Sequence, residues 1–237
     1  MFFKRPSLER GHSHLGWLDS YFSFSFADYY DPKYRGFSVL RVINEDRIQG
    51  GEGFPTHGHK DMEIITYIIS GALEHKDTMG NSTVILPGDI QRMSAGSGVE
   101  HSEYNHHKDQ LTHLLQIWLF PHVKGLKPSY EQKSFKKEFA SQDLTLVLSQ
   151  SGRLGSVRIH QDSEVYVAQL KADKKLEFPA NPDRDYWLQV YKGQVVVNDE
   201  FILNSGDGLG VCKENHLLFF TTEGAEFLLF DLPPEKR

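Results

Sequence analysis

Turn signals divide this chain into short segments rich in Val, Ile, Leu, Phe and Tyr. Turns such as Ser70-Gly71, Pro87-Gly88-Asp89 and Ser205-Gly206-Asp207 separate these segments. Segments of this length and composition favour β-strands, whereas amphipathic helical windows are scarce, with a short helix at most over Tyr130–Phe139. The predicted strands are Phe37–Ile43, Glu63–Ile69, Ala72–Lys76, Thr83–Leu86, Ile90–Met93, Leu111–Phe120, Leu144–Leu148, Val165–Leu170, Tyr186–Val190, Gln194–Val197 and Phe227–Leu229. The pattern predicts an all-β fold, either a sandwich or a barrel.

A weak internal repeat predicts two β domains. Gly71 corresponds to Gly193, and the pair Gly88-Asp89 corresponds to Gly206-Asp207. The length of 237 residues is enough for two small domains, each with its own core. We expect an N-terminal domain over residues 1–122, a charged linker over 123–143, and a C-terminal domain over 144–237.

Composition excludes several classes of protein. The single cysteine, Cys212, cannot form an intrachain disulfide or a thiolate metal cluster, so the ligands of any bound metal are nitrogen and oxygen. The net charge is −6 without a long basic run, which argues against direct binding of nucleic acid. No apolar run is long enough to span a membrane, and the N-terminus does not resemble a secretory signal. We therefore expect a cytoplasmic protein without a membrane partner.

Histidine is concentrated in the first half of the chain. Ten of the twelve histidines precede residue 123. His57 and His59 share one face of an extended strand, and His101 and Glu103 repeat that spacing about forty residues later. Neighbouring antiparallel strands inside a barrel would bring the two pairs together. Three imidazoles and a carboxylate suit one divalent first-row ion such as Fe(II), Ni(II), Cu(II), Mn(II) or Zn(II), and an octahedral ion would keep two positions open.

Other residues near these two pairs are expected to support the site without binding the metal. Glu63 has the same parity as His57 and His59, and we expect it to orient an imidazole ligand rather than to bind the ion. Gln116 and His113 have opposite parity, so at most one faces the cavity. Phe54 and Met62 are candidates for an apolar pocket wall. We expect the remaining nearby histidines to lie at the rim or to form hydrogen bonds, namely His75, His106, His107, His113 and His122.

Both His-containing stretches resemble cupin motifs, and the whole chain resembles the pirin family, in particular the bacterial pirin-like proteins associated with quercetin 2,3-dioxygenase activity. The first motif comprises Gly51, His57-Gly58-His59, Glu63 and Gly71, and the second comprises Pro87-Gly88-Asp89, His101 and Asn105. The resemblance runs end to end and includes Arg10–Pro32, Gly36–Asp46, Met93–Asn105, Leu114–Pro121, Tyr130–Lys133 and the terminal LLFDLPP. The chain departs from the family at Phe22-Ser23, and from cupins generally at Ser94.

The resemblance implies a bicupin, two jelly-roll-like β-barrels face to face. It implies one divalent transition metal, with Fe(II) favoured, held by His57, His59, His101 and Glu103. The implied function is a metal-dependent dioxygenase that cleaves flavonols such as quercetin with O2. Glu103 is then the candidate to accept the proton of the substrate hydroxyl. The alternative is a metal-dependent regulatory protein that binds a protein partner without physiological turnover.

The internal repeat also makes a prediction about the second domain. Shifted along the repeat, His57 and His59 fall on Pro179 and Asn181, and His101 and Glu103 fall on Phe219 and Thr221. The set of three imidazoles and one carboxylate therefore does not survive in the second copy. We therefore expect the C-terminal domain to bind no metal.

Overall fold

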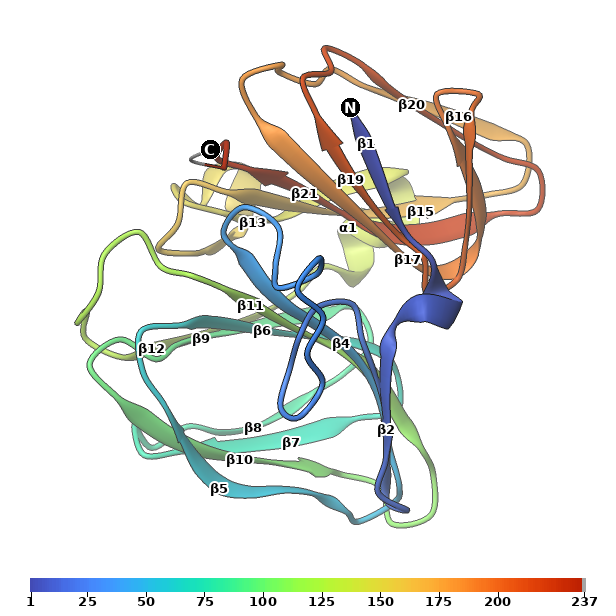
Figure 1. Ribbon diagram of the computed structural model, residues 1–237. Helices are drawn as coiled ribbons and strands as arrows, with labels where there is room; N and C mark the ends of the chain where they lie inside the picture. Colours follow the sequence, from blue (N-terminus) through green and yellow to red (C-terminus); the bar gives the residue numbers. More distant parts are fainter. Residues whose placement is uncertain (236–237) are drawn as a thin grey trace.

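Three β-sheets make up nearly all the regular structure in residues 1–235, the part of the chain that the computed structural model describes. Sheets of four and seven strands form an N-terminal barrel, and a ten-stranded sheet curls into a second barrel. In Figure 1 the seven-stranded sheet lies between the four-stranded sheet and the C-terminal barrel. The predicted all-β fold with two barrels is confirmed.

The N-terminal barrel is antiparallel throughout. Its seven-stranded sheet has the order β12 (Ser129–Ser134), β9 (Asp89–Ser94), β6 (Glu63–Ser70), β11 (Thr112–Leu119), β4 (Leu40–Ile48), β3 (Leu18–Phe22) and β2 (Gly11–His14). The four-stranded sheet has the order β5 (Gly53–His59), β10 (Val99–Asn105), β7 (Leu73–Asp77) and β8 (Ser82–Ile85).

The C-terminal barrel is built on one long strand, β17 (Asp185–Val197), which pairs with four others. The main order of its sheet is β1 (Phe2–Arg5), β19 (Gly208–Cys212), β17, β21 (Ala225–Leu232), β15 (Glu164–Leu170), β13 (Leu144–Ser149) and β14 (Val157–Arg158). The remaining strands are β16 (Lys174–Phe178), β18 (Phe201–Asn204) and β20 (Leu217–Thr221). The helices are η1 (Ser7–Glu9), α1 (Lys136–Ser141) and η2 (Arg153–Gly155), and none among residues 1–235 has the length and apolar character needed to cross a membrane.

The expected helix over Tyr130–Phe139 is wrong. Strand β12 occupies its first half, and only Lys136–Ser141 are helical. Strand β12 pairs with β9 along its whole length, which satisfies the backbone groups of β9 on that side and makes β12 the edge strand of the sheet. The segment expected to be a linker therefore completes the N-terminal sheet.

The first strand belongs to the other barrel. Phe2–Arg5 pair with β19, so β1 lies in the C-terminal sheet, as Figure 1 shows. The expected N-terminal domain thus differs from the structure at its start. The chain reaches the N-terminal barrel only after the η1 turn, where the backbone N–H of Ser7 donates to Asp207 at 2.7 Å.

The two Gly-Asp turns that suggested an internal repeat have the same geometry. Gly88 and Gly206 have φ values of 89° and 88°, a region that favours glycine. The Asp89 carboxylate accepts a hydrogen bond from the N–H three residues earlier, and so does the Asp207 carboxylate. The repeat thus corresponds to a turn that is used once in each barrel.

Alternation along the seven-stranded sheet separates the core from a cavity. Ile43, Ile65 and Leu115 point toward the C-terminal barrel and pack in a core that both barrels share. Asn44 and Gln116, one position along in β4 and β11, point into the N-terminal barrel and line a cavity there. The face toward the N-terminal barrel thus combines polar residues at the cavity with apolar residues such as Ile48 and Ile68, which pack in a separate cluster.

Candidate metal centre

Strands β5 and β10 bring the two predicted residue pairs together. His57 lies directly opposite His101 in the antiparallel ladder. The register slips by one residue before Glu103, where β5 contains the additional residue next to Pro55, which has no backbone N–H to pair. On β10, His101 and Glu103 are both buried while their neighbours are more exposed. The predicted sharing of a face is therefore confirmed for this pair.

Three imidazoles surround one point inside the barrel. The ring centroids of His57 and His59 are 4.8 Å apart, those of His57 and His101 4.5 Å, and those of His59 and His101 4.9 Å. One nitrogen of each ring lies within 4.8 Å of one nitrogen of the others. This spacing allows all three rings to bind a single ion.

A chain of hydrogen bonds sets the tautomer of His101. The Asp77 carboxylate accepts from Nε2–H of His75 at 3.0 Å, and in the tautomer that carries its single ring proton there, Nδ1 of His75 is an acceptor. That atom lies 3.4 Å from Nδ1 of His101, which therefore donates. Nε2 of His101 then carries a free electron pair, and it is buried without a hydrogen-bond partner among residues 1–235. A buried acceptor in this state fits a metal ligand.

The other two imidazoles also present an electron pair. Nδ1–H of His57 donates to the carbonyl oxygen of Pro55 at 2.8 Å, which leaves Nε2 unprotonated. The His59 ring meets Trp118 edge to face, with centroids 4.9 Å apart. Burial lowers the pKa of His59 to about 4 and that of His101 to about 3, with the neighbouring imidazoles adding to both shifts. Both rings are neutral at pH 7, as metal binding requires.

The carboxylate of Glu103 lies beside this group and is held from the seven-stranded sheet. Nε2 of Gln116 lies 3.0 and 3.3 Å from the two carboxylate oxygens, and the Thr66 hydroxyl donates to one of them at 3.4 Å. Glu103 forms a second group of closely spaced candidate ligand atoms with His101 and His75. His101 thus belongs to both groups. Both groups lie in the N-terminal barrel, whereas Phe219, at a repeat position, is buried in the C-terminal core.

A cavity of about 220 Å³ opens next to these side chains. Its wall combines the candidate ligands with aromatic rings and with polar side chains of the seven-stranded sheet. The aromatic residues are Phe22, Phe26, Phe54 and Trp118, and the polar residues include Ser20, Asn44, Asp46 and Gln116. An aromatic molecule that bears hydroxyl groups matches this lining.

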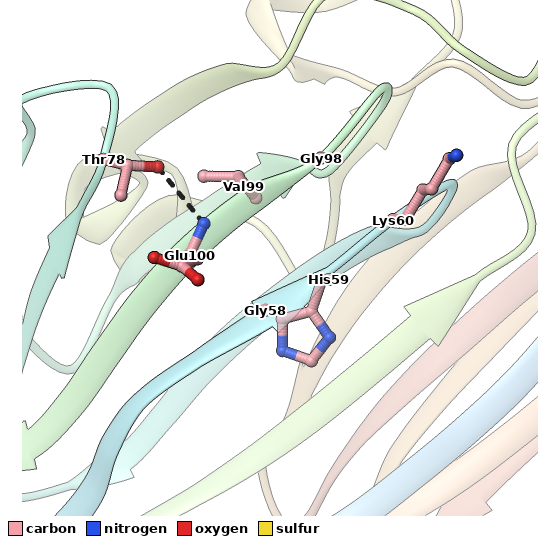
Figure 2. A pocket seen from close by; sticks show the side chains of 7 residues that line it. All are labelled: Gly58, His59, Lys60, Thr78, Gly98, Val99 and Glu100. Atoms are coloured by element: carbon pink, nitrogen blue, oxygen red, sulfur yellow. Dashed lines mark hydrogen bonds between the residues drawn. The ribbon is translucent and has the colours of Figure 1, made fainter.

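The outer side of β5 and β10 has a different character. Figure 2 shows an open depression there, where the Thr78 hydroxyl accepts a hydrogen bond from the backbone N–H of Glu100 at 3.2 Å. The imidazole of His59 extends from β5 away from Thr78 and Glu100 (Figure 2). The three-imidazole group therefore faces the barrel interior.

The structure contradicts the roles expected for Glu63 and Met62. Glu63 does not orient an imidazole ligand: its carboxylate accepts hydrogen bonds from Ser94 at 2.9 Å and from the backbone N–H of His160 at 3.1 Å. The turn at Asp61, which has a φ of 50°, breaks the strand parity on which the expectation rested. Met62 packs in a separate apolar cluster, whereas Phe54 does line the cavity.

Two further expectations are confirmed. His75 is a buried, hydrogen-bonded residue. Of the pair with opposite parity, Gln116 faces the cavity, while His113 bonds Glu45 at 2.9 Å on the other side of the sheet.

Sequence reasoning missed the cavity wall formed by β3 and β4. Ser20 and Asp46 are register partners there, and Asn44 lies two residues before Asp46 on the same strand; all three side chains are buried. The consecutive polar residues Asn44, Glu45 and Asp46, which directly follow the predicted strand over Phe37–Ile43, are a usable signal. Leu18–Phe22 is absent from the predicted strands, so the sequence did not indicate that a neighbouring strand places Ser20 beside Asp46.

Two similar barrels, one of which encloses imidazole and carboxylate side chains around a cavity, define a bicupin. The chain belongs to the pirin family: the sequence profile of that family matches residues 5–119. A second profile, described as the quercetinase C-terminal cupin domain, matches residues 146–232.

Relatives match over almost the whole length. A quercetin 2,3-dioxygenase of Escherichia coli K12 is 47% identical over 234 residues, which cover 99% of this chain and 100% of the relative. A pirin-like protein of Caulobacter vibrioides is 39% identical, with 96% and 98% covered. The crystal structure of bacterial pirin YhhW from Escherichia coli in complex with nickel(II) has a TM-score of 0.94 at 46% identity, covering 99% of this chain and 100% of that one.

Proposed function

We propose that this chain is a metal-dependent dioxygenase that cleaves flavonols such as quercetin with O2. The single observation that carries the proposal is the buried, unpartnered Nε2 of His101, which faces two further imidazoles beside an aromatic cavity. The name of the Escherichia coli relative and the nickel(II) in the YhhW complex support the same reading. His57, His59, His101 and Glu103 would hold one divalent ion, either Fe(II), which we favour, or another first-row metal.

The chain's own residues would act on the substrate hydroxyl. A bound divalent ion acts as a Lewis acid that lowers the pKa of an enol hydroxyl. The Glu103 carboxylate takes the proton, so that the O–H bond of the substrate breaks and an O–H bond of Glu103 forms. The amide of Gln116 holds that carboxylate in place through its hydrogen bonds to both oxygens. Phe22, Phe26 and Phe54 contact the substrate rings and exclude water.

The size of the cavity bears on how a flavonol would fit. A volume of about 220 Å³ is below the roughly 300–1,000 Å³ that is usual for sites enclosing drug-sized ligands. We expect the enol-bearing part of a flavonol to enter, while the remainder extends out of the cavity past exposed lining residues such as Leu15.

Oxygen consumption tests this proposal. We expect protein loaded with Fe(II) or Ni(II) to bleach quercetin absorbance with matching loss of dissolved O2. His101→Ala should lose both the metal and the activity, whereas His106→Ala, whose side chain is 48% exposed at the rim, should keep both. Metal-loaded protein that leaves quercetin and O2 unchanged would rule the proposal out.

A further inference from the structure

The wall formed by β3 and β4 has features that the proposed chemistry does not use. Ser20 and Asp46 are register partners, and Ser20 Oγ donates a hydrogen bond to the Asp46 carboxylate. Asn44 lies two positions earlier in β4 and points into the same cavity. All three side chains are more than nine-tenths buried. They are polar groups placed where apolar residues would give a more stable barrel.

Asn44 lacks the partner that a buried amide needs. Its Oδ1 has no hydrogen-bond partner within residues 1–235, although it is shielded from solvent. A buried acceptor without a partner destabilises the fold, because the loss of its hydration is not compensated. A ligand donor in the cavity would offset this cost. The vacant acceptor therefore points to a bound molecule that carries an O–H or N–H group at this position.

Asp46 presents a second acceptor on the same strand. Burial raises the pKa of Asp46 to about 7, although the hydrogen bond from Ser20 lowers it. Whether ionised or protonated, the carboxyl keeps an oxygen that accepts a hydrogen bond. No lysine or arginine is among the residues that line this cavity. Away from the proposed metal ligands, a carboxylate or phosphate group would thus meet acceptors and no cationic side chain, whereas a neutral hydroxyl can donate to Asn44 and Asp46.

We propose that Asn44 and Asp46 determine substrate specificity by accepting hydrogen bonds from ring hydroxyls other than the one that engages the metal. The inference rests on the proposed function and deepens it: the substrate class is a polyhydroxylated aromatic compound. The aromatic side chains of the cavity contact the ring faces, and the β4 wall selects the hydroxyl pattern. A site built to bond a hydroxyl discriminates strongly against an analogue that lacks it, because its own polar groups then stay unpaired.

A comparison of two flavonols distinguishes binding of the ring hydroxyls from coordination of the metal by the enol group. Quercetin carries ring hydroxyls in addition to its enol group, and 3-hydroxyflavone carries the enol group alone. We expect the nickel-loaded protein, titrated without oxygen and followed by flavonol absorbance, to bind quercetin more tightly. Asn44→Leu and Asp46→Leu should each weaken quercetin binding about fivefold to tenfold. The same variants should change the affinity for 3-hydroxyflavone by less than about twofold and should retain full metal content.

Gln91→Leu is the matched control. Gln91 is also buried with an unpartnered side-chain oxygen among residues 1–235, but it does not line the cavity, so both affinities should stay unchanged. Equal binding of both flavonols by the unmodified protein would overturn the inference and leave the proposed function standing. Binding of neither would overturn both. Variants that lose the metal, or lose both flavonols equally, would assign Asn44 and Asp46 a structural role and contradict the inference.

Discussion

The chemistry of the centre depends on which nitrogen of each imidazole is free. The tautomers of His75 and His101 are coupled: the hydrogen bond to Asp77 places the proton of His75, and the contact with His75 places the proton of His101. The three side chains come from β7 and β10, which are adjacent in the four-stranded sheet. This arrangement directs the free electron pair of His101 toward the other imidazoles.

Removing His75 tests this chain of hydrogen bonds. We expect His75→Phe to weaken metal affinity about 10- to 100-fold, because His101 Nδ1–H loses its acceptor and the ring can rotate or change tautomer. Competition with a chelator measures the change. His106→Phe, at the exposed rim, is the control. Unchanged affinity in His75→Phe would mean that packing alone positions His101.

At the scale of the element, the centre depends on how closely β5 approaches β10. Gly53 begins β5 opposite Tyr104, and a Cβ atom there would lie 2.2 Å from the carbonyl oxygen of Glu103. Only glycine permits this approach without a shift of one strand. The slipped register at Pro55 then lets Phe54 and His57 both point inward.

Substitution of Gly53 should separate these strands. We expect Gly53→Ala to displace the Glu103 backbone and to lower the metal affinity. We also expect the free energy of unfolding to fall by about 1–3 kcal/mol, as it does for overpacked cores. Gly51→Ala provides a comparison with backbone strain but without a clash, because its φ is 73° and nothing lies within 4 Å of a Cβ at that position. Calorimetry and chelator competition on both variants check this. Wild-type metal affinity in Gly53→Ala would show that β10 tolerates the shift.

At the scale of the whole molecule, the segment that passes between the barrels adds polar contacts to the apolar core that they share. The Arg10 guanidinium packs against the Gly206 turn of the C-terminal barrel and forms an ion pair with Glu45 of β4 at 2.9 Å. Glu45 also bonds Arg47 and His113, each at 2.8–2.9 Å. Burial alone would raise the pKa of Glu45, but the His113 and Arg10 interactions outweigh it and lower the pKa to about 2.

Acid should therefore loosen this contact between the barrels. The pKa of Glu45 is lower in the folded protein than its usual 4.5, so its contribution is complete above pH 4.5 and is lost as pH falls toward 2. We expect Glu45→Gln to reduce the free energy of unfolding by about 2 kcal/mol at pH 6, and by much less at pH 3. Urea unfolding across this range measures the difference. A difference that stays constant with pH would contradict the assignment.

Much of the fold could be predicted from local signals. Strands bounded by glycine and aspartate turns, such as β6, β9 and β11, follow from alternation and turn chemistry, which act over a few residues. The paired spacings of His57 with His59 and of His101 with Glu103 likewise identified the candidate site, because strand periodicity is a local property. The short edge strands β1 and β12 escaped prediction, since pairing with a distant sheet edge stabilises them.

The sequence by itself determined that the chain is all β, that any metal would meet nitrogen and oxygen ligands, and which residues could supply them. Tertiary structure decided which face each residue occupies. The turn at Asp61 sends Glu63 toward His160, the pairing of β4 with β3 joins Asp46 to Ser20, and the pairing of β7 with β10 places His75 behind His101. The physical reason is that register between distant strands depends on the packing of whole sheets, which no local pattern records.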